Sequence, residues 1–89
     1  MNWNVLLTGP ARKQLAALDA KDYRLIVKAL KAMEGDPRGG DVLKLEGALG
    51  GFRGRAGNWR IFFDLYPEQL QVVVSAIVRR TTTTYRNRG

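Results

Sequence analysis

Residues 51–79 read GFRGRAGNWRIFFDLYPEQLQVVVSAIVR, and this stretch decides the fold. It holds three runs of aromatic, β-branched or alternating residues, separated by the turn-forming dipeptides Gly57-Asn58 and Pro67-Glu68. Such a pattern is typical of consecutive antiparallel strands joined by tight turns. The strands are predicted at Phe52–Ala56, Trp59–Tyr66 and Leu70–Arg79. The second half of the chain therefore forms a three-stranded meander.

A two-residue turn at Gly57-Asn58 fixes the register of the first hairpin. It pairs Arg55 with Arg60 and Arg53 with Phe62, and directly paired residues share a face of the sheet. Arg53, Arg55 and Arg60 are thus predicted on one face. The opposite face receives only apolar side chains, those of Phe52, Ala56, Trp59, Ile61 and Phe63.

A turn at Pro67-Glu68 predicts the register of the last two strands in the same way. The expected pairs are Phe63 with Val72, Ile61 with Val74, Trp59 with Ala76 and Arg60 with Ser75. In this register Ser75, Ile77 and Arg79 join the arginine face, whereas Leu65, Leu70, Val72, Val74, Ala76 and Val78 join the apolar face. Arg79 would then be the fourth arginine on a face opposite the one that helices can cover.

The first half of the chain predicts one strand and two helices. Residues 3–8 suit a strand, and Gly9-Pro10 ends it, because proline is favoured in the first turn of a helix. Asp19 can cap a second helix, whose apolar stripe runs from Tyr23 to Met33 and which stops at Gly35. Residues 42–46 favour no single element. The expected fold class is α+β: an N-terminal strand and a two-helix hairpin packed on an antiparallel sheet whose last three strands form a meander, in one domain of residues 1–89.

Composition narrows the class of protein. A chain of 89 residues holds one modest core. It has no cysteine, so no disulfide framework supplements that core. The cysteine content is therefore compatible with a reducing compartment. No apolar run is long enough to span a bilayer, and residues 1–4 lack the features of a signal peptide. We therefore expect a cytoplasmic protein. Without histidine or cysteine, the sequence predicts neither a metal site nor a cofactor.

The net charge of +7 is concentrated in the second half of the chain. Residues 51–89 hold seven basic residues, all arginine, against Asp64 and Glu68. The planar guanidinium group suits phosphate, and arginines paired across two strands repel one another unless an anion lies between them. This pattern favours binding of a polyanion. A merely solvated basic surface is the alternative.

The element order and several segments together resemble the RelE/ParE toxins of type II toxin–antitoxin systems. The matching segments are residues 45–47 (LEG), residues 51–63 (GFRGRAGNWRIFF), residues 78–80 (VRR) and Tyr85. The resemblance implies a cognate antitoxin as partner, with oligomers formed only through that complex. RelE-like toxins cut messenger RNA on the ribosome, whereas ParE-like toxins inhibit DNA gyrase without nuclease chemistry. A third alternative is a family member that only binds nucleic acid or its antitoxin.

The resemblance also implies roles for single residues. Arg60 and Arg79 match the strand arginines that hold the scissile phosphate, and Arg53, Arg55 and Arg80 are the expected RNA-binding residues. Because the chain has no histidine, Tyr85 is the leading catalytic candidate for deprotonating or orienting the ribose 2′-hydroxyl. The alternative is that Tyr85 packs the tail, and four threonines between Arg80 and Tyr85 make the spacing long. Lys44 and Glu46 are interpreted as structural, Asp64 as an ion-pair partner and Phe62 as packing.

Overall fold

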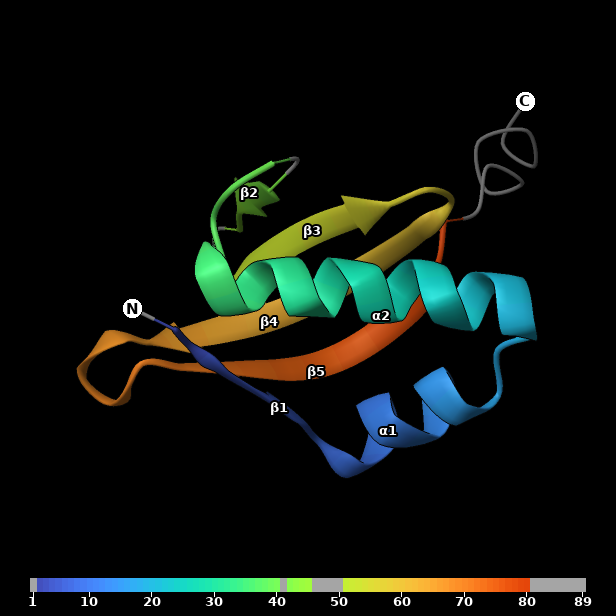
Figure 1. Cartoon of the computed structure of the whole chain (residues 1–89), viewed down its shortest axis with the longest axis horizontal. Coiled ribbons are helices and arrows are strands. Elements are labelled where there is room, and N and C mark those ends of the chain that lie inside the picture. Colours follow the sequence, from blue (N-terminus) through green and yellow to red (C-terminus); the bar gives the residue numbers. More distant parts are fainter. Residues whose placement is uncertain (1, 41, 46–50, 81–89) are drawn as a thin grey trace.

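The computed structural model of the chain describes residues 2–40, 42–45 and 51–80. Within these ranges the element order is β1 (Asn4–Leu7), α1 (Gly9–Ala16), α2 (Ala20–Gly35), β2 (Val42–Lys44), β3 (Phe52–Ala56), β4 (Trp59–Tyr66), η2 (Pro67–Gln69, a single 3-10 turn) and β5 (Gln71–Arg79). The strands form one sheet in the order β1-β5-β4-β3-β2 (Figure 1). This arrangement confirms the predicted α+β class, with two additions. β1 pairs with β5 in parallel, and β2 is an edge strand antiparallel to β3.

α2 begins after the predicted cap, and α1, predicted from about Pro10 to Leu18, spans Gly9–Ala16 with a cap that was not predicted. Thr8 precedes α1, and its hydroxyl oxygen accepts a hydrogen bond from the Ala11 amide at 3.3 Å. Asp19 precedes α2, and its carboxylate accepts one from the Asp22 amide at 2.8 Å. Each cap satisfies a backbone N–H group that the first turn of a helix leaves without a partner. The predicted second helix, from an Asp19 cap to Gly35, is confirmed.

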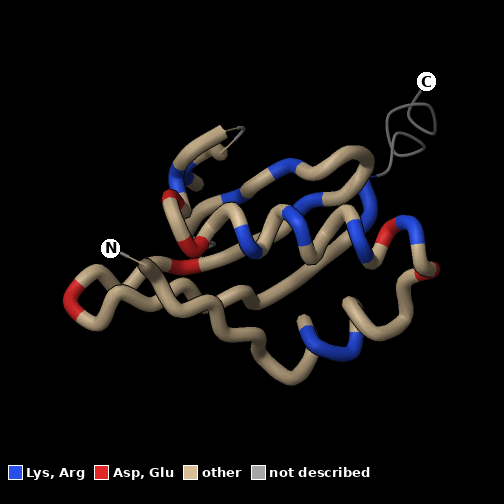
Figure 2. The backbone as a smooth tube through the Cα atoms, in the orientation of Figure 1, with Lys and Arg blue, Asp and Glu red and all other residues tan. Residues whose placement is uncertain are grey.

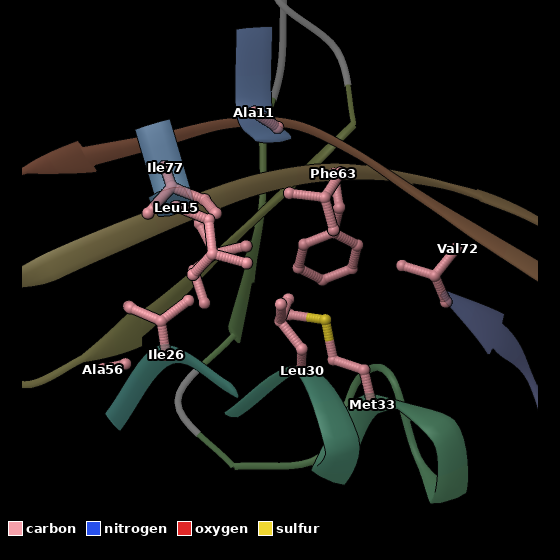
Figure 3. Packing of buried hydrophobic residues seen from close by; sticks show 11 residues of the cluster. Ala11, Leu15, Ile26, Leu30, Met33, Ala56, Phe63, Val72 and Ile77 are labelled. Carbon is pink, nitrogen blue, oxygen red and sulfur yellow. The ribbon is translucent and has the colours of Figure 1, made fainter. Parts of the chain in front are cut away.

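The two helices cover one face of the sheet with apolar side chains. Figure 3 shows Leu30 and Met33 of α2 pointing toward Phe63 of β4, with Leu15 of α1 beside Ile77 of β5. The buried cluster comprises Ala11, Leu15, Ile26, Leu30, Met33, Ala56, Ile61, Phe63, Val72, Val74 and Ile77. In the described part of the chain no polar or charged residue is buried. The hydrophobic effect therefore holds the helices on this face of the sheet.

The edge of β5 beyond β1 is closed by α1. β1 pairs only with residues 71–74 of β5. Farther along, the Thr8 hydroxyl donates to the Ser75 carbonyl oxygen at 3.2 Å, and the Ile77 amide donates to the Gln14 side-chain oxygen at 2.6 Å. Side chains of α1 and of the residue before it thus replace a neighbouring strand, which leaves fewer unpaired backbone groups on this edge.

The first hairpin has the predicted register. Arg55 pairs with Arg60, Arg53 with Phe62, and Phe52 with Phe63. Of the two turn residues only Gly57 has a positive φ, +61°, which is the pattern of a type II′ turn with glycine at its first central position. A two-residue turn of this kind allows one register for the flanking strands, so the faces of β3 and β4 follow from the sequence.

The predicted register of the second hairpin is wrong. The connection is longer than two residues: η2 occupies Pro67–Gln69, and Leu70 follows with a left-handed φ of +53°. β4 and β5 therefore start pairing at Tyr66 and Gln71, which shifts the register by two residues and keeps the faces as predicted. Val72 and Val74 are accordingly buried.

A β-bulge then reverses the faces of the rest of β5. Phe63 pairs with Val74 and Phe62 with Ala76, so that Ser75 is an extra residue. The observed pairs beyond it are Ile61 with Ile77, Arg60 with Val78 and Trp59 with Arg79. The predicted sides of Ala76, Ile77, Val78 and Arg79 are therefore wrong. One extra residue in a strand moves every later side chain to the other face.

Alanine substitutions at Ile77 and Val78 distinguish the two registers. Ile77 is 2% exposed and Val78 36% exposed. We expect Ile77→Ala to lower the free energy of unfolding by about 2–5 kcal/mol, because it leaves a cavity in the core. Val78→Ala should change it by less than about 0.5 kcal/mol, as for a surface residue. Urea denaturation measures both, and the opposite order of the two variants would restore the register predicted from the turn alone.

Glycine is required at Gly51, at the start of β3. Its φ is +72°, and a β-carbon there would lie 2.8 Å from the Phe63 carbonyl oxygen and 2.5 Å from an Asp64 carboxylate oxygen. We expect Gly51→Ala to destabilise the protein by about 1–3 kcal/mol. Gly35→Ala is the matched control, since no atom lies within 4 Å of its would-be β-carbon. It should be neutral or stabilising by up to about 1 kcal/mol in the same denaturation experiment, and equal losses in both variants would contradict the explanation.

Candidate nucleic-acid interface

The face of the sheet that the helices leave uncovered is called the open face here. Strand pairing arranges its side chains in rows across β3, β4 and β5. The first row contains Arg55, Arg60 and Val78, and the second contains Arg53, Phe62 and Ala76. A third row pairs Asp64 with Val73, next to Leu6 of β1. The open face thus changes from cationic to aromatic and then to acidic along β4.

Three of the predicted site residues lie together on the open face. Arg55 and Arg60 are direct partners in the β3–β4 hairpin, and Arg53 lies one row away on the same face. Arg55 is exposed, whereas Arg53 and Arg60 are half-buried. The buried Nε of Arg53 has no hydrogen-bond partner among the described residues. Like charges directly opposite each other on a sheet repel, and a phosphate bound among these arginines would offset that repulsion.

Arg79 and Arg80 lie differently from the prediction. Arg79 pairs with Trp59 on the side of the sheet that carries the core, and its guanidinium carbon is 5.8 Å from the centre of the Trp59 ring. The distance is that of a cation–π contact. Arg80 is exposed, and its amide donates to the Asn58 carbonyl oxygen at 2.7 Å. The expectation of four arginines on one face is therefore corrected to three. Tyr85 lies outside the described residues, as do Glu46 and Gly47.

The positive charge of the strands gathers at one end of the sheet. Figure 2 shows Lys and Arg along β3, near the hairpin end of β4 and at the end of β5, whereas the acidic positions of β4 and of the following turn lie toward the opposite end. A second group of basic residues lies along α2, on the other side of the molecule from the open face. A polyanion is therefore attracted to the hairpin end of the open face.

A hollow of about 280 Å³ adjoins the arginines and was not predicted from the sequence. Its lining includes Leu45, Phe62, Asp64, Ser75 and Ala76. The bulge helps to form it, because the Ser75 hydroxyl donates to the Phe62 carbonyl oxygen at 3.3 Å. Because Phe62 and Asp64 alternate with core residues along β4, the sequence already predicted them on the same face as the arginines. The bulge itself has no signal in the sequence.

No group of three or more histidine, cysteine, aspartate or glutamate residues gathers in the part of the chain that the structure describes. None of the described helices combines the length and apolar character needed to cross a bilayer.

Comparison with solved structures places this fold among those of toxin–antitoxin proteins. The toxin–antitoxin complex RelBE2 from Mycobacterium tuberculosis matches with a TM-score of 0.82 and 23% identity, over 90% of this chain and 93% of that chain. The archaeal RelE–RelB complex from Pyrococcus horikoshii matches with a TM-score of 0.79 and 24% identity, over 92% and 99%. A YoeB/ParE toxin from Agrobacterium tumefaciens matches with a TM-score of 0.75 and 14% identity, over 88% and 99%.

No protein-family profile matches the sequence, and no curated protein matches it significantly. The structural likeness, over nearly the full length of each protein, defines the class of fold. The chain has the RelE/ParE toxin fold, as its sequence pattern indicated. More particularly, the structures with the higher TM-scores are of RelE type.

Salt dependence of RNA binding tests the open face. We expect Arg60→Gln to weaken binding of a short single-stranded RNA and to reduce the slope of log affinity against log salt by about 0.7, because one phosphate contact is lost. Arg24→Gln, on the exposed side of α2, removes the same charge away from the open face. It should leave the slope unchanged in fluorescence anisotropy titrations, and equal effects of the two substitutions would assign RNA binding to net charge alone.

Proposed function

We propose that this protein is the toxin of a toxin–antitoxin pair and that it inhibits translation by cutting messenger RNA on the ribosome. The observation that carries the proposal is the cluster of Arg53, Arg55 and Arg60 on the open face of a RelE-type fold. Three cations on a rigid hairpin match the phosphates of a single strand. The fold supports the toxin class, and the arginines support RNA as the ligand.

The proposed reaction is a transesterification within the RNA. The ribose 2′-oxygen attacks the adjacent phosphorus, the bond from phosphorus to the 5′-oxygen breaks, and a 2′,3′-cyclic phosphate and a 5′-hydroxyl result. Negative charge grows on the phosphoryl oxygens in the transition state, where preorganised cations lower the barrier most. Arg60 and Arg53 are suited to hold these oxygens, because the sheet fixes both on one face. The proposal invokes no metal ion or cofactor.

Proton transfer needs further groups, since no histidine is present. We assign Tyr85 to deprotonating or orienting the 2′-hydroxyl, as the resemblance implies. Arg79 lies at the exposed end of β5, on the side of the sheet that carries Trp59. To contact the scissile phosphate on the open face, its side chain would have to extend around the end of this strand. Arg55 and Arg80 are proposed to bind neighbouring phosphates. In this assignment Arg60 contributes most to binding the scissile phosphate, and Arg79 contributes less.

Partners follow from the same proposal. RelE was solved with RelB in the Pyrococcus complex and within RelBE2 in the Mycobacterium complex, which supports a cognate antitoxin for this chain. The ribosome and messenger RNA are the proposed targets in the cytoplasm, and higher oligomers are proposed to form only through the antitoxin.

The alternative function is inhibition of DNA gyrase without cleavage. It is supported by the match to the YoeB/ParE toxin. It is also supported by the position of Arg79, since only three of the four expected arginines share the open face. A surface that binds gyrase does not need converging cations, so the arginine cluster favours the nuclease.

Mapping of messenger RNA ends distinguishes the two functions. The protein is added to a bacterial translation extract, and RNA ends are located by primer extension. We expect discrete ends inside translated codons, a loss of cutting of at least about 100-fold in Arg60→Ala because transition-state charge is left without its cation, and a smaller loss in Arg79→Ala. Arg24→Ala serves as the control for net charge and should cut normally. Intact messages together with loss of supercoiling by purified gyrase would establish the alternative.

A further inference from the structure

The hollow beside the arginines is lined by aromatic, acidic and hydroxyl-bearing residues, which the binding of phosphate alone does not require. It adjoins the second and third rows of the open face, where Phe62, Asp64 and Ser75 line it. We propose that this hollow holds one unpaired base of the bound strand and selects a base with an exocyclic amino group, cytosine over uracil. The inference rests on the proposed function only in taking single-stranded RNA as the ligand.

Spacing along β4 agrees with one nucleotide. Arg60 and Phe62 are two residues apart on the same face, about 7 Å at the rise of a β-strand. A phosphate held at Arg60 and Arg53 therefore leaves its attached base within reach of Phe62. Asp64, two residues farther along, lies where the outer edge of that base would end. The order of cation, ring and carboxylate along β4 repeats the order of phosphate, base plane and base edge in a nucleotide.

The interior of the hollow suits a planar base. Phe62 is half-buried, and Leu45 and Ala76 add further apolar lining. Base stacking on an aromatic side chain is the common way in which proteins hold unpaired nucleotides. At about 280 Å³ the hollow has room for one base.

The polar groups of the hollow favour an amino group. An ionised carboxylate only accepts hydrogen bonds, and the Ser75 hydroxyl already donates to the Phe62 carbonyl oxygen, which leaves its lone pairs to accept. The amino group of cytosine donates to such acceptors. Uracil presents a carbonyl oxygen at the same ring position, and two acceptors facing each other repel. Asp64 is thus the specificity-determining residue of the proposed site.

The Asp64 carboxylate lies beside Gly51, at the start of β3 and next to the hollow. One of its oxygens lies 2.5 Å from the position that a β-carbon of Gly51 would occupy. Only glycine leaves room for the carboxylate there, and Gly51 also has the positive φ that glycine tolerates. Glycine at this position therefore leaves space for the carboxylate beside the hollow, where it can accept a hydrogen bond from a base.

Titration with mononucleotides tests the pocket without ribosome, antitoxin or cleavage. Cytidine and uridine 5′-monophosphate carry the same phosphate and differ in the group that Asp64 would contact. Amide chemical shifts of the full chain are followed by NMR. We expect cytidine monophosphate to shift the amides of Phe62, Asp64, Ser75 and Ala76 and to bind about tenfold more tightly than uridine monophosphate, as for a hydrogen bond to a charged group.

Two variants complete the test, and the spectrum itself reports whether each is folded. Asp64→Asn can donate to the uracil oxygen, so the ratio of the two affinities should fall to about one or below. Glu68→Gln, an exposed acid in η2, is the matched control and should keep the wild-type ratio. Ser75→Ala should reduce the ratio less than Asp64→Asn, since an uncharged acceptor contributes less.

The outcomes separate this inference from the proposed function. Equal affinities of the two nucleotides for the wild-type protein, shifts confined to the arginines, or no shifts with either nucleotide overturn the base pocket, even if messenger RNA is cut. Discrimination that Asp64→Asn abolishes supports the pocket, even if the translation extract shows no cutting. In that case the nuclease proposal fails and a base-selective binding surface remains.

Discussion

Burial of the sheet under α1 and α2 is the constraint on which the rest of the structure depends. Phe63 and Ile61 of β4 are 1% exposed and pack against Leu30, Met33 and Ile26 of α2. Because side chains alternate along a strand, the neighbours Arg60, Phe62 and Asp64 must then point to the open face. The same hydrophobic effect that stabilises this small protein therefore also orients its candidate site. A site built on the central strands of a buried sheet is held more rigidly than one built on loops.

The bulge at Ser75 reconciles two requirements on β5. Near β1, Val72 and Val74 are buried in the core, and farther along it is Ile77 that packs beneath α1. Without an extra residue, Ile77 would face away from the helices and Ser75 would lie on the open face between paired neighbours. The bulge brings Ile77 into the core and moves Arg79 to the Trp59 side. It also shapes the hollow beside Phe62, so one local irregularity affects both stability and the site.

Charge and shape on the open face have separate consequences for function. Arg53, Arg55 and Arg60 attract any polyanion, and this attraction carries no sequence information. The hollow next to them offers an aromatic ring and hydrogen-bond acceptors, which are the kinds of group that distinguish bases. The proposed cutting of messenger RNA within translated codons would need both properties. The RelE-type fold provides the frame, and the residues on three adjacent strands decide what it binds.

Several features were determined by the sequence alone, since their causes lie within a few residues. Thr8 and Asp19 cap the helices through contacts three residues away. Gly57-Asn58 fixes the β3–β4 register and, with it, the shared face of Arg53, Arg55 and Arg60. Local turn geometry and alternation suffice for such features.

The course of β5 was decided only by the tertiary structure. Leu70 adopts a left-handed conformation that nothing in its residue type predicts. The strand beyond the bulge is held by Gln14 and Thr8, which lie 63 and 67 residues away from the groups they bond. The faces of Ile77, Val78 and Arg79, the parallel pairing of β1 and the hollow all depend on these distant contacts. A register that is set by packing against another element cannot be counted from the nearest turn, because the free energy that selects it comes from residues far away in the chain.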